Sequence, residues 1–283
     1  MEKMQNASAP ATVQLYHFWS SVCSVRCRMA LEEKGVKWES KYIDLFKFDQ
    51  LTPEYLSINP DGVVPTLVCD GHPIRESVII NEFIDDAFPG IKLIPSDPLL
   101  AAKMREFIRT CENAMGPIAT LTFVKYILPK LRNRWSDEEL REQAEKRPTK
   151  FLRDLHSRGI RGEISKSELA QAAGDLERLL DGLEATLEPG PWIVGEFSLA
   201  DVTIAPYMFR LSALGQDQFW SVERRPRINA WYQKLSARPA FQAAVSWPDE
   251  NGGGYQEVGL SSAAPSKAAV SLKSNSFDAP PET

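Results

Sequence analysis

The chain has 283 residues, of which 43% are hydrophobic and 25% charged, which is typical of a globular protein large enough for two domains. The formal charge of −5 argues against nucleic acid or an anionic membrane surface as the main partner. No apolar run is long enough to span a membrane. Four cysteines in a chain of this length do not make a disulfide framework, so we expect a cytoplasmic protein.

Residues 1–11 are predicted to be a disordered tail, and residues 12–92 a first domain. Alternating apolar residues and turn residues predict four strands and three helices there. The strands are expected at 13–18, 37–43, 64–69 and 72–74, and the helices at 24–34, 52–58 and 77–88. Gly35 is predicted to end the first helix, and Asp70-Gly71 to form the turn of a hairpin between the last two strands. This order predicts a mixed four-stranded sheet with helices packed against it.

Residues 91–98 are predicted to form a turn-rich linker, and residues 99–247 carry only helical periods. Within them, the strongly charged residues 132–164 are predicted as polar helix and loop. Leucines between Leu169 and Leu187 fall on one helical face, and Ser198-Leu199-Ala200-Asp201 is a capping box that starts another helix. An all-helical second domain is therefore predicted for 99–247. Residues 248–283 contain too few apolar side chains to pack and are predicted to be a disordered tail.

Pro65 follows Val64 at the start of a predicted strand. Proline cannot donate to a central ladder, but it can stand where a strand begins, and a cis bond there would turn the Val64 backbone outward. Exposed main-chain groups of this kind pair with an extended peptide. Glu76 and Ser77 then open a helix with a carboxylate, a hydroxyl and free N–H groups. Together these residues predict a site for a small peptide with free amino and carboxyl groups.

Three motifs in this order resemble the cytosolic glutathione transferases over residues 13–247. They are Val64-Pro65-Thr66-Leu67, the pair Glu76-Ser77, and the capping box at Ser198. The resemblance implies a thioredoxin-like glutathione-binding domain followed by an all-helical domain that forms the acceptor site. It also implies glutathione as cosubstrate, bound through Val64, Pro65, Glu76 and Ser77, and a homodimer.

The loop Ser20-Ser21-Val22-Cys23-Ser24 narrows the resemblance. It is similar to the serine loop of zeta-class enzymes. In that alignment Ser21 falls at the position of their catalytic serine, and Cys23 at the position of their cysteine. The tract from Trp135 through Leu187 is similar to serine-type bacterial β-aryl-etherases, an alignment in which the catalytic region falls on Cys23 and Ser24. Ser21 is the favoured catalytic residue, and Cys23 and Ser24 are the alternatives.

A serine in this position acts as a hydrogen-bond donor. Its hydroxyl and the positive end of the following helix would both lower the pKa of the glutathione thiol. Val63 stands where these relatives usually have a glutamine, so one contact to the peptide is missing, and Gln50 is expected near the glycine end. Arg26 and Lys47 are further candidate donors to the anionic ligand, and a solvated surface position is the alternative for Arg26. No metal site is expected, because the Cys and His residues lack a ligand spacing.

We therefore expect an enzyme that transfers the glutathione thiolate to a small hydrophobic or aromatic electrophile. Cleavage of a β-aryl ether is the first specific reaction expected. A zeta-like isomerase or dehalogenase is the alternative, and a non-catalytic binding module is a third possibility. Structural roles compete with these assignments. Ser21, Ser24 and Glu76-Ser77 also suit helix starts, and the aromatic residues Phe107, Phe123, Tyr126, Tyr207 and Phe209 suit a core.

Overall fold

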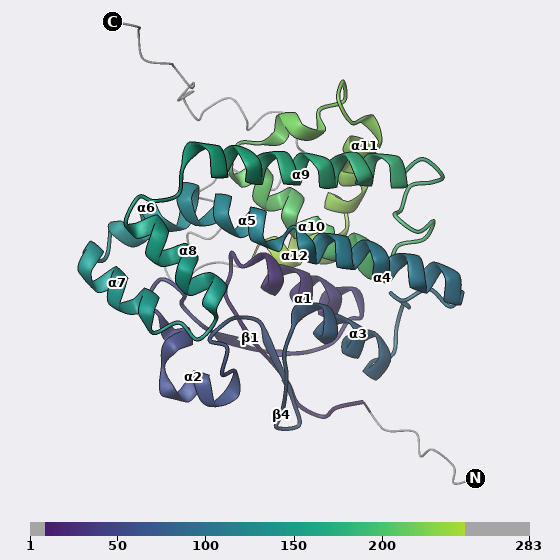
Figure 1. The fold of residues 1–283 in the computed structure, drawn as a ribbon. Helices are drawn as coiled ribbons and strands as arrows, with labels where there is room; N and C mark the ends of the chain where they lie inside the picture. The colour runs from purple at the N-terminus through teal and green to yellow at the C-terminus, as the bar shows by residue number, and fades with distance from the viewer. Residues whose placement is uncertain (1–8, 247–283) are drawn as a thin grey trace, which may run out of the picture.

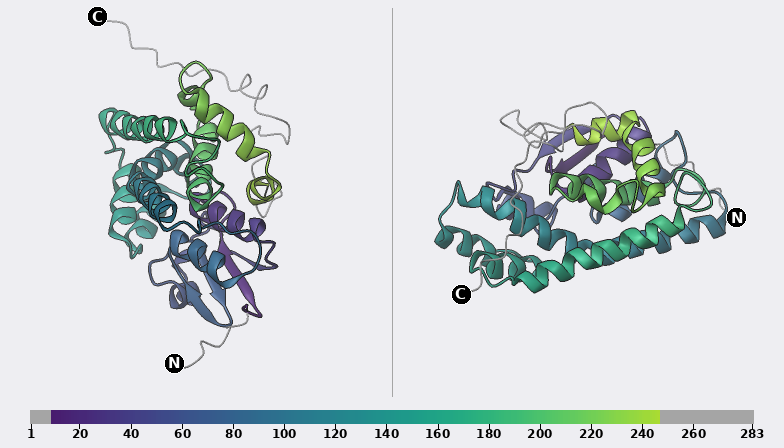
Figure 2. Two further views of the ribbon diagram at one scale, coloured as in Figure 1. Left: turned by 90° about the vertical axis from the view of Figure 1, so that its right-hand side faces the viewer. Right: turned by 90° about the horizontal axis from the view of Figure 1, so that it is seen from above.

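The computed structural model describes residues 9–246, so the predicted tail at 248–283 and most of the predicted tail at 1–11 lie outside the described residues. Figure 1 shows a sheet with its helices below a larger group of helices, and Figure 2 shows the same molecule from the side and from above. The predicted fold class, a thioredoxin-like domain followed by an all-helical domain, is confirmed.

The sheet contains four strands in the order β2-β1-β3-β4. They are β1 (Val13–His17), β2 (Glu39–Tyr42), β3 (Thr66–Cys69) and β4 (His72–Ile74). β1 is parallel to β2 and antiparallel to β3, and β3 and β4 form the predicted hairpin. Asp70 and Gly71 at its turn both have positive φ, 48° and 82°, as a tight two-residue turn requires.

The first domain carries three α-helices and one short 3-10 helix. They are α1 (Val22–Glu33), η1 (Asp49–Leu51), α2 (Pro53–Ile58) and α3 (Ser77–Ala87). The predicted stop of α1 at Gly35 is confirmed, since Gly35 has φ of 64°, a conformation that side chains with a Cβ disfavour.

The strand register brings the predicted site residues to one end of the sheet. Tyr16 lies opposite Thr66, so the end of β1 and the start of β3 meet where Pro65 introduces the latter. Leu67 lies opposite Ile74, so the residues just after β4, where α3 begins, meet the same end. The α1 loop follows β1 directly, and β2 ends beside it in parallel. The loop at Ser21, Pro65 and the pair Glu76-Ser77 therefore lie at the same end of the strands, which we call the sheet edge.

The second domain is helical throughout its described part, as predicted. Its helices are α4 (Pro98–Asn113), α5 (Met115–Thr122), the π-helix η2 (Phe123–Ile127), α6 (Leu128–Arg132), α7 (Asp137–Glu145), α8 (Lys150–Ile160), α9 (Lys166–Thr186), α10 (Leu199–Ala213), η3 (Asp217–Trp220), α11 (Pro226–Ser236) and α12 (Pro239–Val245). None of these helices is long and apolar enough to cross a membrane in the part of the chain described.

α10 is the central helix of this domain, and its start was predicted correctly. Ser198 and Asp201 form the capping box, with the Ser198 N–H donating to the Asp201 carboxylate at 3.0 Å. The same carboxylate accepts from the Trp231 indole at 2.8 Å, which ties α10 to α11. Nearly every residue of α10 is buried, including Pro206 in its interior, so the helix is held by packing on all sides.

The two domains share a helical interface. α1 packs against α10 and α12, and Figure 1 shows these helices between the sheet and α9. The α7–α8 hairpin, formed by the charged stretch predicted as polar helix and loop, also reaches the first domain. The Trp135 indole donates to the Phe46 carbonyl at 2.9 Å, and the Thr149 hydroxyl donates to the Asp61 carbonyl at 3.0 Å. These contacts tie this part of the helical domain to the first domain.

Candidate active site

The Val64–Pro65 peptide bond is cis, as the sequence predicted. The carbonyl of Val63 just before it accepts from the Tyr55 hydroxyl at 2.6 Å and from the Asn59 amide at 2.9 Å. In the described part of the chain, neither the N–H nor the C=O of Val64 has a hydrogen-bond partner. Buried main-chain groups are nearly always paired, so these two are available to an extended peptide ligand.

Glu76 is held in an unusual backbone conformation. Its φ is 65° and its ψ is 112°, and it is the residue that immediately precedes α3. A non-glycine residue in this region costs on the order of 1–2 kcal/mol, and such residues concentrate at functional sites. The Glu76 carboxylate is exposed and makes no hydrogen bond or ion pair within residues 9–246. It is therefore free to bind a cationic amine.

Ser77 is buried and held in place from the protein side. Its hydroxyl accepts from the Arg26 guanidinium at 3.1 Å, and its carbonyl accepts from the Cys27 thiol at 3.6 Å. Because Ser77 opens α3, its N–H group has no partner within the helix. An anionic carboxylate is the ligand that this end of a helix attracts.

Arg26 is fully buried, so it is not the solvated surface residue that the sequence left open, nor does it extend into solvent to meet a ligand. Its guanidinium pairs with Glu112 of α4 at 2.6 Å and lies 5.5 Å from the centre of the Tyr207 ring. Arg26 thus supports Ser77 from the protein interior and joins the first domain to α4 and α10.

Ser21 and Ser24 have different positions in the loop before α1. Ser21 is the residue that caps α1, is half-buried, and accepts the Ser24 N–H at 3.2 Å. Its own O–H remains available to donate. Ser24 has no exposed surface, and its hydroxyl accepts the Phe18 N–H at 3.3 Å. Burial and the hydrogen bond from Phe18 favour a structural role for Ser24, which is therefore the weaker of the catalytic alternatives.

Cys23 lies one residue before Ser24 and is partly exposed. Burial of the sulfur raises the pKa of the Cys23 thiol above its ordinary value, and the nearby Arg26 guanidinium and Ser77 hydroxyl oppose this only in part. A thiol with a raised pKa is a weak nucleophile near neutral pH. Of the three residues predicted from the loop, Ser21 has the geometry best suited to a hydrogen-bond donor.

Two buried arginines hold the main chain of this loop from below. Arg28 donates to the carbonyls of Phe18 at 3.2 Å and Trp19 at 2.7 Å, and also to Ala244 at the end of α12. Arg210 of α10 donates to the Ser20 carbonyl. Three successive carbonyls are thus fixed, which positions Ser21 relative to the sheet edge. Charged donors make the strongest hydrogen bonds of this type.

Gln50 is buried in η1, and both atoms of its side-chain amide lack a hydrogen-bond partner among the described residues. An unsatisfied buried amide costs free energy of about 1–3 kcal/mol, which a polar ligand would recover. Lys47 behaves differently: half of its side chain is exposed, and it lies 3.4 Å from the Asp44 carboxylate. Gln50 stays a candidate for the ligand site, whereas Lys47 has a protein partner.

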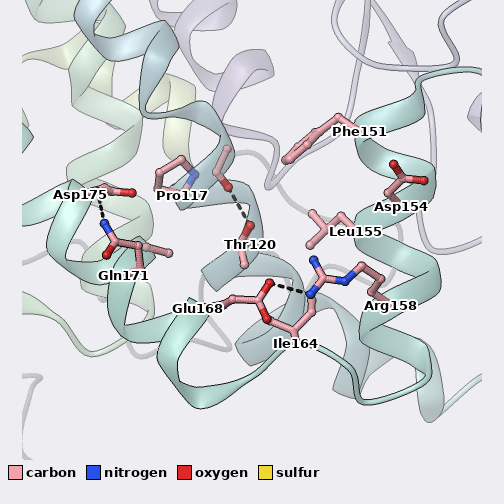
Figure 3. A pocket seen from close by; sticks show the side chains of 12 residues that line it. Pro117, Thr120, Phe151, Asp154, Leu155, Arg158, Ile164, Glu168, Gln171 and Asp175 are labelled. Atoms are coloured by element: carbon pink, nitrogen blue, oxygen red, sulfur yellow. Dashed lines mark hydrogen bonds and ion pairs between the residues drawn. The ribbon is translucent and has the colours of Figure 1, made fainter.

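A separate groove of about 340 Å³ lies between α5, α8 and α9. Figure 3 shows its apolar wall, with Phe151 and Leu155 on one side, and the ion pair between Arg158 and Glu168. The Arg158 Nη2 lies 2.6 Å from the Glu168 Oε1. None of the predicted site residues lines this groove. It is therefore distinct from the sheet edge where those residues meet.

The assembled edge brings together the exposed Glu76 carboxylate, the start of α3, the unpaired main chain of Val64 and the Ser21 hydroxyl, which suits an extended peptide with a free amine and a free carboxylate. No cluster of metal-binding side chains occurs within residues 9–246. The sequence did not reveal Glu112 or Arg210, which reach the edge from α4 and α10. No local signal identifies them, because a charged residue within a helical period looks like any solvated position.

The chain matches two family descriptions, "Glutathione S-transferase, N-terminal domain" over residues 11–86 and "Glutathione S-transferase, C-terminal domain" over residues 166–234. It is 30% identical to Protein LigF of Sphingobium sp. strain NBRC 103272 / SYK-6, over 82% of this chain and 92% of that protein. It is 29% identical to the tetrachloro-p-hydroquinone reductive dehalogenase of Sphingobium chlorophenolicum, over 85% of this chain and 98% of that protein.

Among solved structures, the β-etherase LigF from Sphingobium sp. strain SYK-6 aligns with a TM-score of 0.76 and 28% identity. The alignment covers 82% of this chain and 98% of that structure. Sequence, fold and the arrangement of the site agree, and the chain belongs to the glutathione S-transferase family.

Proposed function

We propose that this member of the family transfers the glutathione thiolate to an aromatic or hydrophobic electrophile, and that β-aryl ethers are the first class of acceptor to test. The observation that carries the proposal is the unpaired main chain of Val64, which lies at the same sheet end as Glu76, Ser77 and Ser21. The similarity to LigF, whose structure is described as that of a β-etherase, supports the choice of acceptor.

Glutathione fits this edge in one direction. Its cysteinyl unit would pair with the N–H and C=O of Val64, and its γ-glutamyl end would meet the Glu76 carboxylate and the N-terminus of α3 at Ser77. The glycine end would then extend toward Gln50, whose buried amide has no other partner among the described residues. The sulfur would face the loop that ends at Ser21.

Ser21 is the residue we propose to activate the thiol. Its hydroxyl accepts one N–H and keeps its proton for donation to sulfur, and α1 begins at the next residue. Hydrogen bonding to the anion and the positive end of the helix both favour the thiolate. The thiolate then attacks the acceptor carbon, a C–S bond forms, and the C–O bond breaks with the electron pair on the departing phenolate.

Calorimetric titration with glutathione, followed by turnover of a panel of β-aryl ethers, aryl halides and maleyl compounds, tests the proposal. Binding of glutathione together with release of a phenol is the expected result. Glutathione binding with no turnover on any acceptor would favour the non-catalytic binding module, and absence of binding would count against the glutathione site itself.

Reductive dehalogenation is a second candidate, favoured by the similarity to the dehalogenase of Sphingobium chlorophenolicum over nearly all of that protein. Cys23, partly exposed and near Ser77, is the residue that would distinguish the two activities. Replacement of Cys23 by alanine should spare ether cleavage and abolish turnover of chlorinated hydroquinones.

We further propose a cytoplasmic homodimer. All four cysteines are free, which suits a reducing compartment. Ile79 of α3 is 56% exposed and Leu99 of α4 is 63% exposed, and the two helices are joined by an ion pair between Glu82 and Arg105 of 2.9 Å. Large exposed apolar side chains mark interaction surfaces when they cluster. Light scattering should report a dimer for the wild type and a monomer for Ile79→Lys combined with Leu99→Lys.

A further inference from the structure

Arg210 is a buried cation without a counter-ion. Its residue is 2% exposed, and although one nitrogen donates to the Ser20 carbonyl, the Nε and a second terminal nitrogen have no hydrogen-bond partner among residues 9–246. No carboxylate in that part of the chain pairs with it, in contrast to Arg26, which has Glu112. An unpaired buried charge is costly, so an anion that arrives with a ligand would be strongly favoured there.

A second cation and an aromatic ring lie beside Arg210. The centre of the Tyr126 ring is 4.9 Å from the Arg210 guanidinium carbon and 4.6 Å from the Lys130 Nζ. Lys130 is also 5.9 Å from the ring of Trp19, which immediately precedes the loop from Ser20 to Ser24. Tyr126 belongs to η2, a π-helical turn between α5 and α6, and such turns are frequent at functional sites.

Arg210 also contacts the main chain beside Ser21, the proposed hydrogen-bond donor to the glutathione thiol. Arg210 and the two groups beside it reach this loop from α10, η2 and α6 of the second domain, which is the part of the fold expected to hold the acceptor. Arg210 contacts Ser20, the residue before Ser21, and Lys130 lies near Trp19, two residues before Ser21. Two positive groups on this loop suit an acceptor on which negative charge develops as the C–S bond forms.

We propose that Arg210, with Lys130 and Tyr126 beside it, forms the site that receives the departing phenolate oxygen of the acceptor. The inference rests on the proposed ether cleavage and deepens it by naming the acceptor class: aromatic ethers whose leaving phenol is too poor to depart unassisted. The glutathione sulfur bonds to carbon, the C–O bond breaks, both electrons remain on oxygen, and the phenolate takes a proton from water after release. The Tyr126 ring packs against the aromatic leaving group.

The test uses β-aryl ethers that differ only in the para substituent of the departing phenol, from nitro to methoxy. Three variants separate charge from structure. Arg210→Gln keeps a donor for the Ser20 carbonyl but removes the charge, Arg210→Lys restores the charge, and Lys130→Met removes the second cation. Arg147→Met is the matched control, since Arg147 is also buried and has no ion pair among the described residues but lies in the loop between α7 and α8.

For Arg210→Gln we expect kcat/KM to fall about 100-fold on the methoxyphenol ether and at most about 5-fold on the nitrophenol ether, because only the poor leaving group needs the charge. Arg210→Lys should recover most of the loss, Lys130→Met should show the same trend more weakly, and Arg147→Met should affect all ethers alike. An equal loss on every ether for Arg210→Gln, or no loss, would overturn the inference while leaving ether cleavage intact. A wild-type protein that binds glutathione but cleaves no ether would overturn both.

Discussion

The Arg26 guanidinium and the Glu112 carboxylate form an ion pair of 2.6 Å that joins α1 of the first domain to α4 of the second. The same guanidinium donates to the Ser77 hydroxyl, so the interdomain contact and the start of α3 share one charged group. The arrangement couples the position of the proposed γ-glutamyl site to the docking of the two domains.

Glu112→Gln should therefore destabilise the protein and weaken glutathione binding together. The substitution leaves Arg26 buried without its counter-ion, which costs about 3 kcal/mol for a fully buried pair and about 2 kcal/mol here, because Glu112 is partly exposed. Urea unfolding and calorimetry measure the two effects. Glu106→Gln, an exposed position on the same helix, is the control. A free energy of unfolding within 0.5 kcal/mol of the wild type, a limit of about the size of ordinary surface effects, would contradict the coupling.

Ser21→Ala should lower kcat/KM at least about 10-fold, the size of one lost activating hydrogen bond. The same variant should raise the pKa of the thiol of bound glutathione, which ultraviolet absorbance of the thiolate reports. Ser24→Ala serves as the comparison: its hydroxyl bonds to the Phe18 N–H, so it should reduce the melting temperature without shifting that pKa. Unchanged turnover in Ser21→Ala would shift the role to Cys23.

Glu76 allows a test of function against stability at one position. Glu76→Ala should abolish retention on immobilised glutathione, because the carboxylate that would bind the amine is lost. Glu76→Gly should also lose retention but raise the stability by up to about 1 kcal/mol, since glycine tolerates the φ of 65° without strain. Thermal unfolding separates the two variants. Retention of either variant on the resin as strong as that of the wild type would remove Glu76 from the ligand site.

His17 makes the stability depend on pH. Burial and the neighbouring Arg28 lower its pKa from 6.5 to about 3 in the folded protein. Below pH 6.5 the imidazole of His17 binds a proton in the unfolded chain but not in the native protein. The contribution of His17 to the free energy of unfolding is therefore fully present above pH 6.5 and is lost as the pH falls toward 3. The slope contributed by this one group approaches about 1.4 kcal/mol per pH unit. His17→Gln should flatten the curve in denaturant unfolding between pH 6.5 and 4.5, and an unaltered slope would rule out this residue as the cause.

The fold follows from local signals that act independently of tertiary contacts. Gly35, the Asp70-Gly71 turn and the Ser198–Asp201 capping box each fix a backbone conformation that their residue types prefer, and each was predicted correctly. The cis bond at Pro65 was also predicted. Helix ends shifted by a residue or two, as they do when the cap lies outside the apolar period.

The less predictable features depend on partners distant in the chain. Arg26 was predicted to meet the ligand or solvent, but packing against Glu112 and Tyr207 encloses it. Ser24 has the same residue type as Ser21 and a similar position in the loop, and only the Phe18 N–H makes it structural. The π-helical turn at Phe123–Ile127 has no periodic signature in the sequence. Charge, residue type and period cannot specify which buried partner a side chain finds.

A crystal structure of the protein with glutathione is the most direct test of the glutathione site. The tripeptide should lie antiparallel to Val64 with its main chain bonded to the N–H and C=O of that residue, its amine on Glu76, and its sulfur within hydrogen-bond distance of the Ser21 hydroxyl. A tripeptide bound elsewhere, or one whose sulfur contacts Cys23 while the Ser21 hydroxyl faces away, would contradict this arrangement.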